Sequence, residues 1–242
     1  MTALELHGVR HAFGRLRALD GFDLRVAGGE VVALVGLNGA GKTTALRVLA
    51  GRLRPDAGVA RVLGHDPATL PAEAAQSFGQ LVGAPLVYRE LTVRENLVAA
   101  ARLHGLSRAQ AIESATTAVE RFELGRWAGR AAGGLSSGNS QRLGLACASL
   151  HRPTALILDE PTSALDPAGV VIVRELVRSL ADDGAGVLVS SHHLDEVSRI
   201  ADRILVAHAG RIVGPLAPGS AELEQQFFAM VLAADSSPRE SA

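Results

Sequence analysis

The chain has 242 residues, 48% of them hydrophobic, a formal net charge of −1 and one cysteine, Cys147. The length allows one large domain or two small ones, the near-neutral charge gives no electrostatic case for nucleic acid as a partner, and one cysteine excludes both an intrachain disulfide and a cysteine-based zinc site. No apolar run approaches the roughly 18 residues that span a bilayer, and the N-terminus lacks the plan of a signal peptide, so we expect a cytosolic chain.

The first elements lead to a glycine-rich loop. Residues 4–9 and 19–26 alternate between apolar and polar, as edge strands do when one face of the sheet is exposed to water. Residues 30–35 are predicted to form a buried strand. A predicted helix at 43–53 follows. Between strand and helix, the pattern G-x-x-x-x-G-K-[ST] is met by Gly36, Leu37, Asn38, Gly39, Ala40, Gly41, Lys42, Thr43 and Thr44.

This loop predicts a nucleoside triphosphate site. Backbone N–H groups and the positive end of the helix dipole would face the phosphates, and the Thr43 hydroxyl would bind Mg²⁺. Lys42 is the only lysine in the chain, and all the other lysine or arginine residues are arginines. A compact ammonium on a thin stem can reach phosphates beside a tight loop, whereas a planar guanidinium is bulkier.

The middle of the chain is helical in character. A turn at 55–58 leads into a strand at 59–63, and from about residue 84 to 150 the pattern is that of helices. Two capping boxes, one starting at Thr92 and one at Ser107, open amphipathic stretches. The second stretch is expected to bury one face, made of Ile112, Ala115, Val119 and Phe122.

Strand patterns return at 154–158, 186–189 and 203–207, and Asp166 with Pro167 predicts the N-terminus of a helix that runs to residue 180. The first of these strands ends in Asp159 and Glu160. Ligands sit at the carboxyl ends of parallel strands, so Asp159 is expected at Mg²⁺ and Glu160 as the general base that orients the attacking water. We predict an ATP-binding core at 1–83 and 151–234, a helical insertion at 84–150 and a disordered tail at 235–242.

Three further segments, 135–142, 163–166 and 190–192, match motifs that point to one particular family. With them the chain resembles the nucleotide-binding subunit of an ABC transporter over nearly its whole length. The resemblance implies an α/β fold: one ABC ATPase domain with a P-loop NTPase (RecA-like) core, an antiparallel β edge and an inserted α-helical subdomain. It implies a Walker A motif at 36–44, a Walker B motif at 156–160, a D-loop that contains Asp166, and a switch histidine, His192, followed by His193 at the start of a helix.

The resemblance also implies how the site works. Lys42, Glu160 and His192 would be the catalytic residues, Thr43 and Asp159 would hold Mg²⁺, and Phe13 would stack on the adenine of ATP. The signature residues would grip the γ-phosphate bound to a second subunit, in a head-to-tail homodimer or heterodimer. They are Ser136, Ser137, Gly138 and Asn139.

The chain departs from the family pattern twice. Ser137 and Asn139 replace a glycine and a glutamine of the signature, and we expect the added Cβ at Ser137 to strain or shift that loop. Gly83 stands where the family has the Q-loop glutamine, and Gln80 is a weak substitute three residues earlier. We therefore hypothesise slow or partner-dependent hydrolysis.

The leading hypothesis is the ATPase subunit of an exporter at the cytoplasmic face of the membrane, held there by a separate transmembrane permease that residues 86–96 contact. The tail at 220–228 resembles the drug, antibiotic and lantibiotic export branch. One alternative is a degenerate, mainly ATP-binding half of a heterodimer. Another is a soluble, non-transport ABC ATPase.

Overall fold

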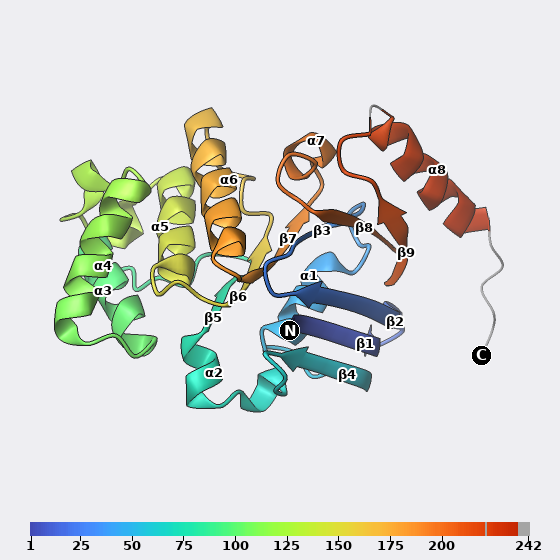
Figure 1. Ribbon diagram of the computed structural model, residues 1–242, viewed down its shortest axis with the longest axis horizontal. Helices are drawn as coiled ribbons and strands as arrows, with labels where there is room; N and C mark the ends of the chain where they lie inside the picture. Colours follow the sequence, from blue (N-terminus) through green and yellow to red (C-terminus); the bar gives the residue numbers. More distant parts are fainter. Residues whose placement is uncertain (221, 237–242) are drawn as a thin grey trace.

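The computed structural model describes residues 1–220 and 222–236 (Figure 1). Its centre is a six-stranded sheet in the order β5-β6-β7-β3-β8-β9, in which all neighbours are parallel except β8 and β9. The strands are β5 (Phe78–Leu81), β6 (Ala155–Asp159), β7 (Gly186–Ser191), β3 (Val31–Val35), β8 (Arg203–His208) and β9 (Arg211–Leu216). Every residue of β3, β6 and β7 is buried, which explains their continuous apolar runs. Neither β5 nor β9 is predicted by the sequence pattern.

A second, antiparallel sheet has the order β2-β1-β4. It consists of β1 (Thr2–Phe13), β2 (Leu16–Ala27) and β4 (Ala57–Val62). Helix α1 (Lys42–Leu49) contacts this sheet and also β6, so it lies between the two sheets. The helix ends earlier than the predicted residue 53, because Gly51 adopts a left-handed conformation and donates its N–H to the Val48 carbonyl at 3.0 Å.

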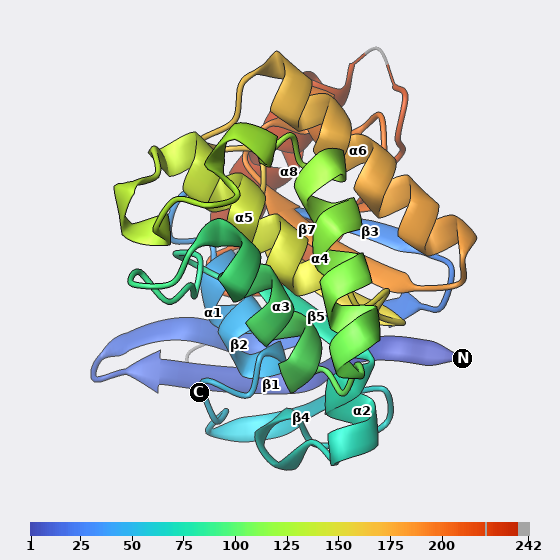
Figure 2. The same cartoon turned by 90° about the vertical axis from the view of Figure 1, so that its left-hand side faces the viewer.

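Three helices form one end of the molecule (Figure 2). They are α3 (Val93–Leu103), α4 (Arg108–Arg121) and α5 (Ser137–Ser149), and the short α2 (Ala72–Gln76) lies before β5. Both predicted capping boxes are present, with Thr92 paired to Glu95 and Ser107 to Gln110. The predicted buried face of α4 is wrong at one position: Ile112 is 47% exposed, and Ala111 lies in the core instead.

The remaining helices flank the other strands. They are α6 (Pro167–Asp182), which begins at the predicted Asp166 N-cap, α7 (Leu194–Val197) and α8 (Leu223–Ser236), besides the 3₁₀ turns η1 (Pro67–Thr69), η2 (Gly125–Trp127) and η3 (Ala132–Gly134). The prediction of a disordered tail from residue 235 is wrong for Asp235 and Ser236, which belong to α8. Asp235 lies 2.7 Å from His208 Nε2 on β8. The rest of that prediction, residues 237–242, lies outside the described residues.

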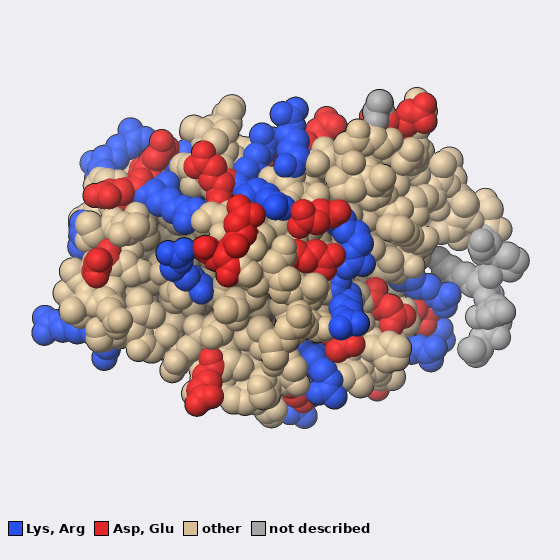
Figure 3. Space-filling model, viewed as in Figure 1, with Lys and Arg blue, Asp and Glu red and all other residues tan. Residues whose placement is uncertain are grey.

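Charges of both signs are interspersed over the α5 and α6 side of the face in Figure 3, whereas the surface over α8 carries few of them. Phe228 and Leu232 of α8 are 47% and 65% exposed. Among the described residues, no helix combines the length and the apolar character that crossing a membrane requires.

Gly186 provides a test of how the two sheets pack. A Cβ at this position would lie 2.4 Å from the Ala3 Cβ and 2.6 Å from the Ala27 carbonyl oxygen, both on the antiparallel sheet. Gly186→Ala should therefore lower the free energy of unfolding by about 1–3 kcal/mol through overpacking. Urea denaturation measures this. Gly129→Ala is the control, because its Cβ would meet open space; equal midpoints for the two variants would contradict the prediction.

Candidate nucleotide-binding site

The glycine-rich loop turns sharply between β3 and α1. Gly39 and Gly41 have φ values of 83° and 100°, the left-handed region that favours glycine. A Cβ on Gly36 would lie 2.3 Å from the Ala207 carbonyl oxygen, and one on Gly41 would lie 2.6 Å from the Ala18 carbonyl oxygen. The loop is thus enclosed by β8 and β2, and α1 begins at Lys42, as the sequence predicts for a helix N-terminus that faces phosphates.

Lys42 is folded back onto its own loop. Its side chain is 7% exposed, and Nζ donates to the Gly36 carbonyl at 2.6 Å and to the Leu37 carbonyl at 3.4 Å. Burial lowers the pKa of this ammonium, while the nearby carboxylates of Glu160 and Asp159 oppose that shift. The cation is held by weak carbonyl partners, which phosphate oxygens can replace with stronger, charge-assisted hydrogen bonds.

A chain of hydrogen bonds joins α1, β6 and β7. Thr43 Oγ1 donates to Asp159 Oδ1 at 3.2 Å, and Ser190 Oγ donates to the same oxygen at 2.6 Å. The Ser190 hydroxyl also accepts from the Glu160 N–H at 3.0 Å and is fully buried. Ser190 fixes both acidic residues, although sequence reasoning gave it no role; its position just before the switch histidine was the available signal.

Thr43 and Asp159 fit a magnesium site. Mg²⁺ takes oxygen ligands and is usually held by one or two protein groups together with substrate phosphates and water. Here a hydroxyl and a carboxylate converge at the mouth of the phosphate-binding loop, and the donor set contains only oxygen.

Glu160 and His192 are in contact. Glu160 Oε2 lies 2.8 Å from His192 Nδ1, and the carboxylate is 25% exposed. Glu160 has a φ of 47°, an uncommon conformation for a residue with a side chain, and it precedes Pro161. Strained backbone of this kind persists where the surrounding structure fixes it, which is frequent at active sites. His193 follows as the N-cap residue of α7, as expected, and is exposed.

The signature residues form the start of a helix. Ser136 is the N-cap residue of α5, and its hydroxyl accepts from the Asn139 N–H at 3.3 Å and from Asn139 Nδ2 at 3.0 Å. The expected strain at Ser137 is wrong, because this residue is the first of the helix and does not need a positive φ. Ser136 and Ser137 are exposed, so the orphan N–H groups of this helix end are open to a second molecule.

Phe13 lies at the end of β1 and is 48% exposed. Its ring contacts His11 edge-on at a centroid distance of 4.7 Å, and His11 lies 3.4 Å from Asp56. The contact orients the ring, and about half of the residue remains exposed and available for stacking on a base.

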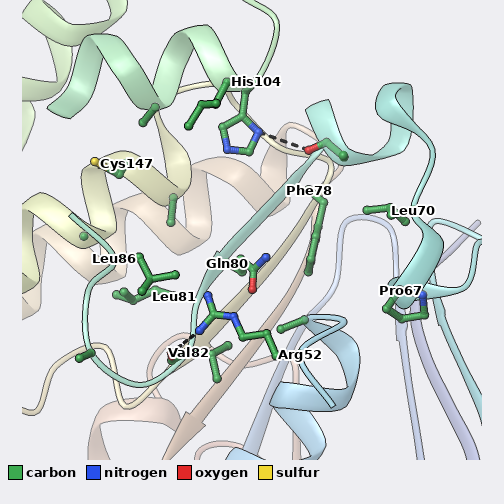
Figure 4. A pocket seen from close by; sticks show the side chains of 17 residues that line it. Arg52, Pro67, Leu70, Phe78, Gln80, Leu81, Val82, Leu86, His104 and Cys147 are labelled. Carbon is green, nitrogen blue, oxygen red and sulfur yellow. Dashed lines mark hydrogen bonds between the residues drawn. The ribbon is translucent and has the colours of Figure 1, made fainter. Parts of the chain in front are cut away.

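Neither Q-loop candidate joins this site. Gly83 has a φ of 70°, where glutamine would be strained. Gln80 belongs to β5 and lines a separate cavity of about 470 Å³, where its Oε1 atom is buried without a hydrogen-bond partner among the described residues (Figure 4). The local backbone explains the glycine, and the structure does not bring Gln80 to Thr43 and Asp159.

A cleft of about 590 Å³ opens beside the loop. It is lined by Gly36–Asn38, by residues 192–196 and by Glu224, Phe227 and Phe228 of α8. The pattern of residues 220–228 does not predict a helix, so the contribution of α8 to this cleft was not expected.

Ser190→Ala tests the hydrogen-bond chain. The variant leaves a carboxylate oxygen of nearly buried Asp159 with one partner fewer, so the free energy of unfolding should fall by about 1–2 kcal/mol. A less well oriented Asp159 should also raise the Mg²⁺ concentration needed for ATP binding by about 10-fold. Ser191→Ala is the matched control, because the Ser191 hydroxyl accepts from the His193 N–H and not from the acidic pair. The same Mg²⁺ dependence in both variants would contradict the assignment.

Known proteins resemble this chain in sequence and in fold. The ABC transporter family model matches residues 19–163. The daunorubicin resistance ATP-binding protein DrrA3 of Streptomyces coeruleorubidus is 42% identical over 88% of this chain and 67% of its own length. The bacitracin transport ATP-binding protein BcrA of Bacillus licheniformis is 34% identical over 88% of this chain and 69% of its own length.

The chain thus spans about two thirds of the length of these relatives. A solved structure, described as the ATP binding subunit of an ABC transporter, superposes with a TM-score of 0.83 at 30% identity and covers 95% of this chain and 94% of its own. A dimeric cassette bound to ADP and Pi has a TM-score of 0.79 at 23% identity and supports the fold alone. The chain belongs to the ABC transporter family, as one of its ATP-binding subunits.

Proposed function

We propose that this chain binds and hydrolyses ATP to power an exporter of a drug, antibiotic or similar compound. The observation that carries the proposal is the Glu160–His192 contact at 2.8 Å beside the Thr43–Asp159 pair. A carboxylate and an imidazole that can orient it thus lie beside the glycine-rich loop, which supports the role of Glu160 as the base. The relatives with resistance and transport names support the export branch.

Each residue has a role in this proposal. Lys42 and the loop N–H groups bind and orient the phosphates, and Phe13 stacks on adenine. Thr43 and Asp159 hold Mg²⁺, which when bound neutralises phosphate charge. Glu160 takes a proton from the attacking water, and His192 holds its carboxylate in place.

The signature helix completes the site of a second subunit. The exposed N-terminus of α5, with the Ser136 hydroxyl, offers N–H groups to a γ-phosphate. Two subunits therefore close head-to-tail around two ATP molecules and open after hydrolysis. That motion drives a separate transmembrane permease, which holds the chain at the cytoplasmic face of the membrane.

One observation favours a second candidate, the mainly ATP-binding half of a heterodimer. Gly83 has no side-chain amide that could reach the Mg²⁺ site, and the side chain of Gln80 lines another cavity. In such a dimer, hydrolysis by this chain alone would be slow and a partner ATPase would supply the competent site.

Glu160→Gln tests the proposed base. The amide keeps the shape of the side chain but cannot take a proton, so the variant should bind ATP like the wild type, hydrolyse at least about 100-fold more slowly and accumulate as an ATP-bound dimer. Turnover against protein concentration and size-exclusion chromatography with MgATP measure this.

The two candidates give different results in the same assay. Wild-type turnover that rises faster than linearly with concentration supports a homodimer, whereas ATP binding without turnover supports the heterodimer. If Glu160→Gln hydrolyses ATP like the wild type, the role of Glu160 is wrong.

The permease would dock at the cavity that contains Gln80. This cavity lies between β5 and the helices α3 and α5 (Figure 4). Leu86 and Leu103 line it and are 75% and 74% exposed, so they form an apolar rim. An apolar rim of this kind suits the apolar face of a short amphipathic helix. If the chain serves an exporter, a cytoplasmic helix of the permease is the partner that would occupy this site.

Leu103→Glu tests this docking site. The charge should prevent burial of the rim, so the chain should lose association with a co-expressed permease while its own ATP affinity is unchanged. Co-purification in detergent measures the association. Ile112→Glu, on an exposed site of α4, is the control; equal retention of both variants would contradict the docking site.

A further inference from the structure

Two segments at the helical end of the molecule pair with each other and carry an excess of positive charge. The Val93 N–H donates to the Arg130 carbonyl at 3.0 Å, and the Arg94 N–H donates to the Ala128 carbonyl at 3.0 Å. The segment that opens α3 and the connection between α4 and α5 therefore lie side by side (Figure 2). Residues 89–94 and 126–130 contain four arginines and one glutamate, in a chain whose formal net charge is −1. The excess of arginine is thus local and not a property of the whole chain.

Three of these arginines have no carboxylate partner. Among the residues that the structure describes, Arg89, Arg126 and Arg130 form no ion pair, and all three are exposed. The fourth, Arg94, donates to the Thr116 hydroxyl at 3.0 Å. An exposed cluster of like charges without counter-charges attracts anions from solution.

The nearby acidic side chains do not neutralise this cluster. Glu95 accepts from the Thr92 N–H at 2.8 Å as part of its capping box, and Glu123 binds Arg142 at 2.6 Å. Glu90 is the one carboxylate within the two paired segments that caps no helix, and it is exposed. The surface therefore keeps a net positive charge.

The indole of Trp127 is a fixed platform for two of the arginines. Trp127 is partly buried and packs against the core. The guanidinium carbons of Arg126 and Arg130 lie over its ring, 5.1 and 4.7 Å from the centroid. A cation–π contact holds a guanidinium through the charge distribution of the ring and forms no N–H···O bond, so the N–H donors of both arginines remain available. Two guanidinium groups held in this way favour an anion with several acceptor oxygens.

We propose that Arg89, Arg126 and Arg130, together with Trp127, bind the phosphate groups of anionic membrane lipids. Arginine can bind a phosphate through two N–H groups at once, and a tryptophan suits the headgroup level of a bilayer because its ring is amphipathic. Leu86, which lines the proposed permease site, precedes Arg89 by three residues, so both contacts belong to one side of the chain. The inference rests on the proposed place of the chain at the membrane and adds a contact that needs no permease.

The contact is weak by itself. Each arginine near an anionic bilayer strengthens binding by about 5-fold, and salt screens this attraction. Three arginines thus give a reversible association, which turns this end of the chain toward the bilayer and assists docking on the permease without replacing it.

Vesicle binding tests the contact in the absence of nucleotide and permease. The chain is mixed with vesicles of equal parts phosphatidylglycerol and phosphatidylcholine, or with vesicles of phosphatidylcholine alone, and the bound fraction is measured by flotation. Binding is expected to the anionic vesicles only and should weaken as salt is added. Trp127 is the only tryptophan of the chain, so its emission reports on this surface directly and should shift to shorter wavelength with the anionic vesicles.

A pair of double variants separates this surface from net charge. Arg126→Gln with Arg130→Gln should weaken binding to the anionic vesicles by about 25-fold. Arg54→Gln with Arg108→Gln is the matched control, because both arginines are exposed, neither has an ion pair in the described part of the chain, and the net charge becomes the same. Equal binding by the two double variants would overturn the proposal.

Other outcomes are also decisive. If the variant at positions 126 and 130 no longer binds MgATP and has therefore lost its fold, Arg89→Gln takes its place and should weaken vesicle binding by about 5-fold. Displacement from the vesicles by inorganic phosphate at the lipid concentration would indicate a site for a free anion and overturn the membrane assignment. An emission change with polyglutamate but not with anionic vesicles would assign the surface to an acidic segment of a partner protein and overturn it as well. Failure of vesicle binding leaves the ATPase proposal standing, because turnover of Glu160→Gln tests that proposal separately.

Discussion

The parallel pairing of β7 with both β3 and β6 is the constraint on which the site depends. Its register places Val35 opposite Ser191 and Asp159 opposite Ser190. Three strands therefore end at one level, and the residues just beyond them, the glycine-rich loop, Glu160 and His192, meet without any long connection. Since all three strands are fully buried, hydrophobic burial sets this register and the polar groups follow from it.

Much of this arrangement could be predicted from the sequence, because the buried strands, the capping boxes and the Asp166 N-cap have strong local signals. The parts that could not be predicted depend on contacts between elements that are distant in the sequence. Helix α8 has no clear polar face and is held by β8 and β9. The family pattern predicts a loop at Ser137, but its backbone is helical. Ser190 gains its role only when β7 lies beside β6, which no local pattern reveals.

The two departures from the family pattern have different physical meanings. The serine in the signature is accommodated by a helix N-terminus, where small hydroxyl residues are common. Gly83 adopts a left-handed backbone, so a glutamine at this position would be strained. The signature residues thus begin a regular helix, whereas position 83 carries no side chain that could link the proposed magnesium ligands to the helical end of the molecule.

The left-handed backbone at Glu160 has a consequence for how this chain can evolve. A non-glycine residue in this region costs on the order of 1–3 kcal/mol, which glycine would not incur. The position is therefore one at which the fold and the chemistry favour different amino acids. A chain freed from the need to turn over ATP is therefore expected to accept glycine at position 160 while keeping its glycine-rich loop.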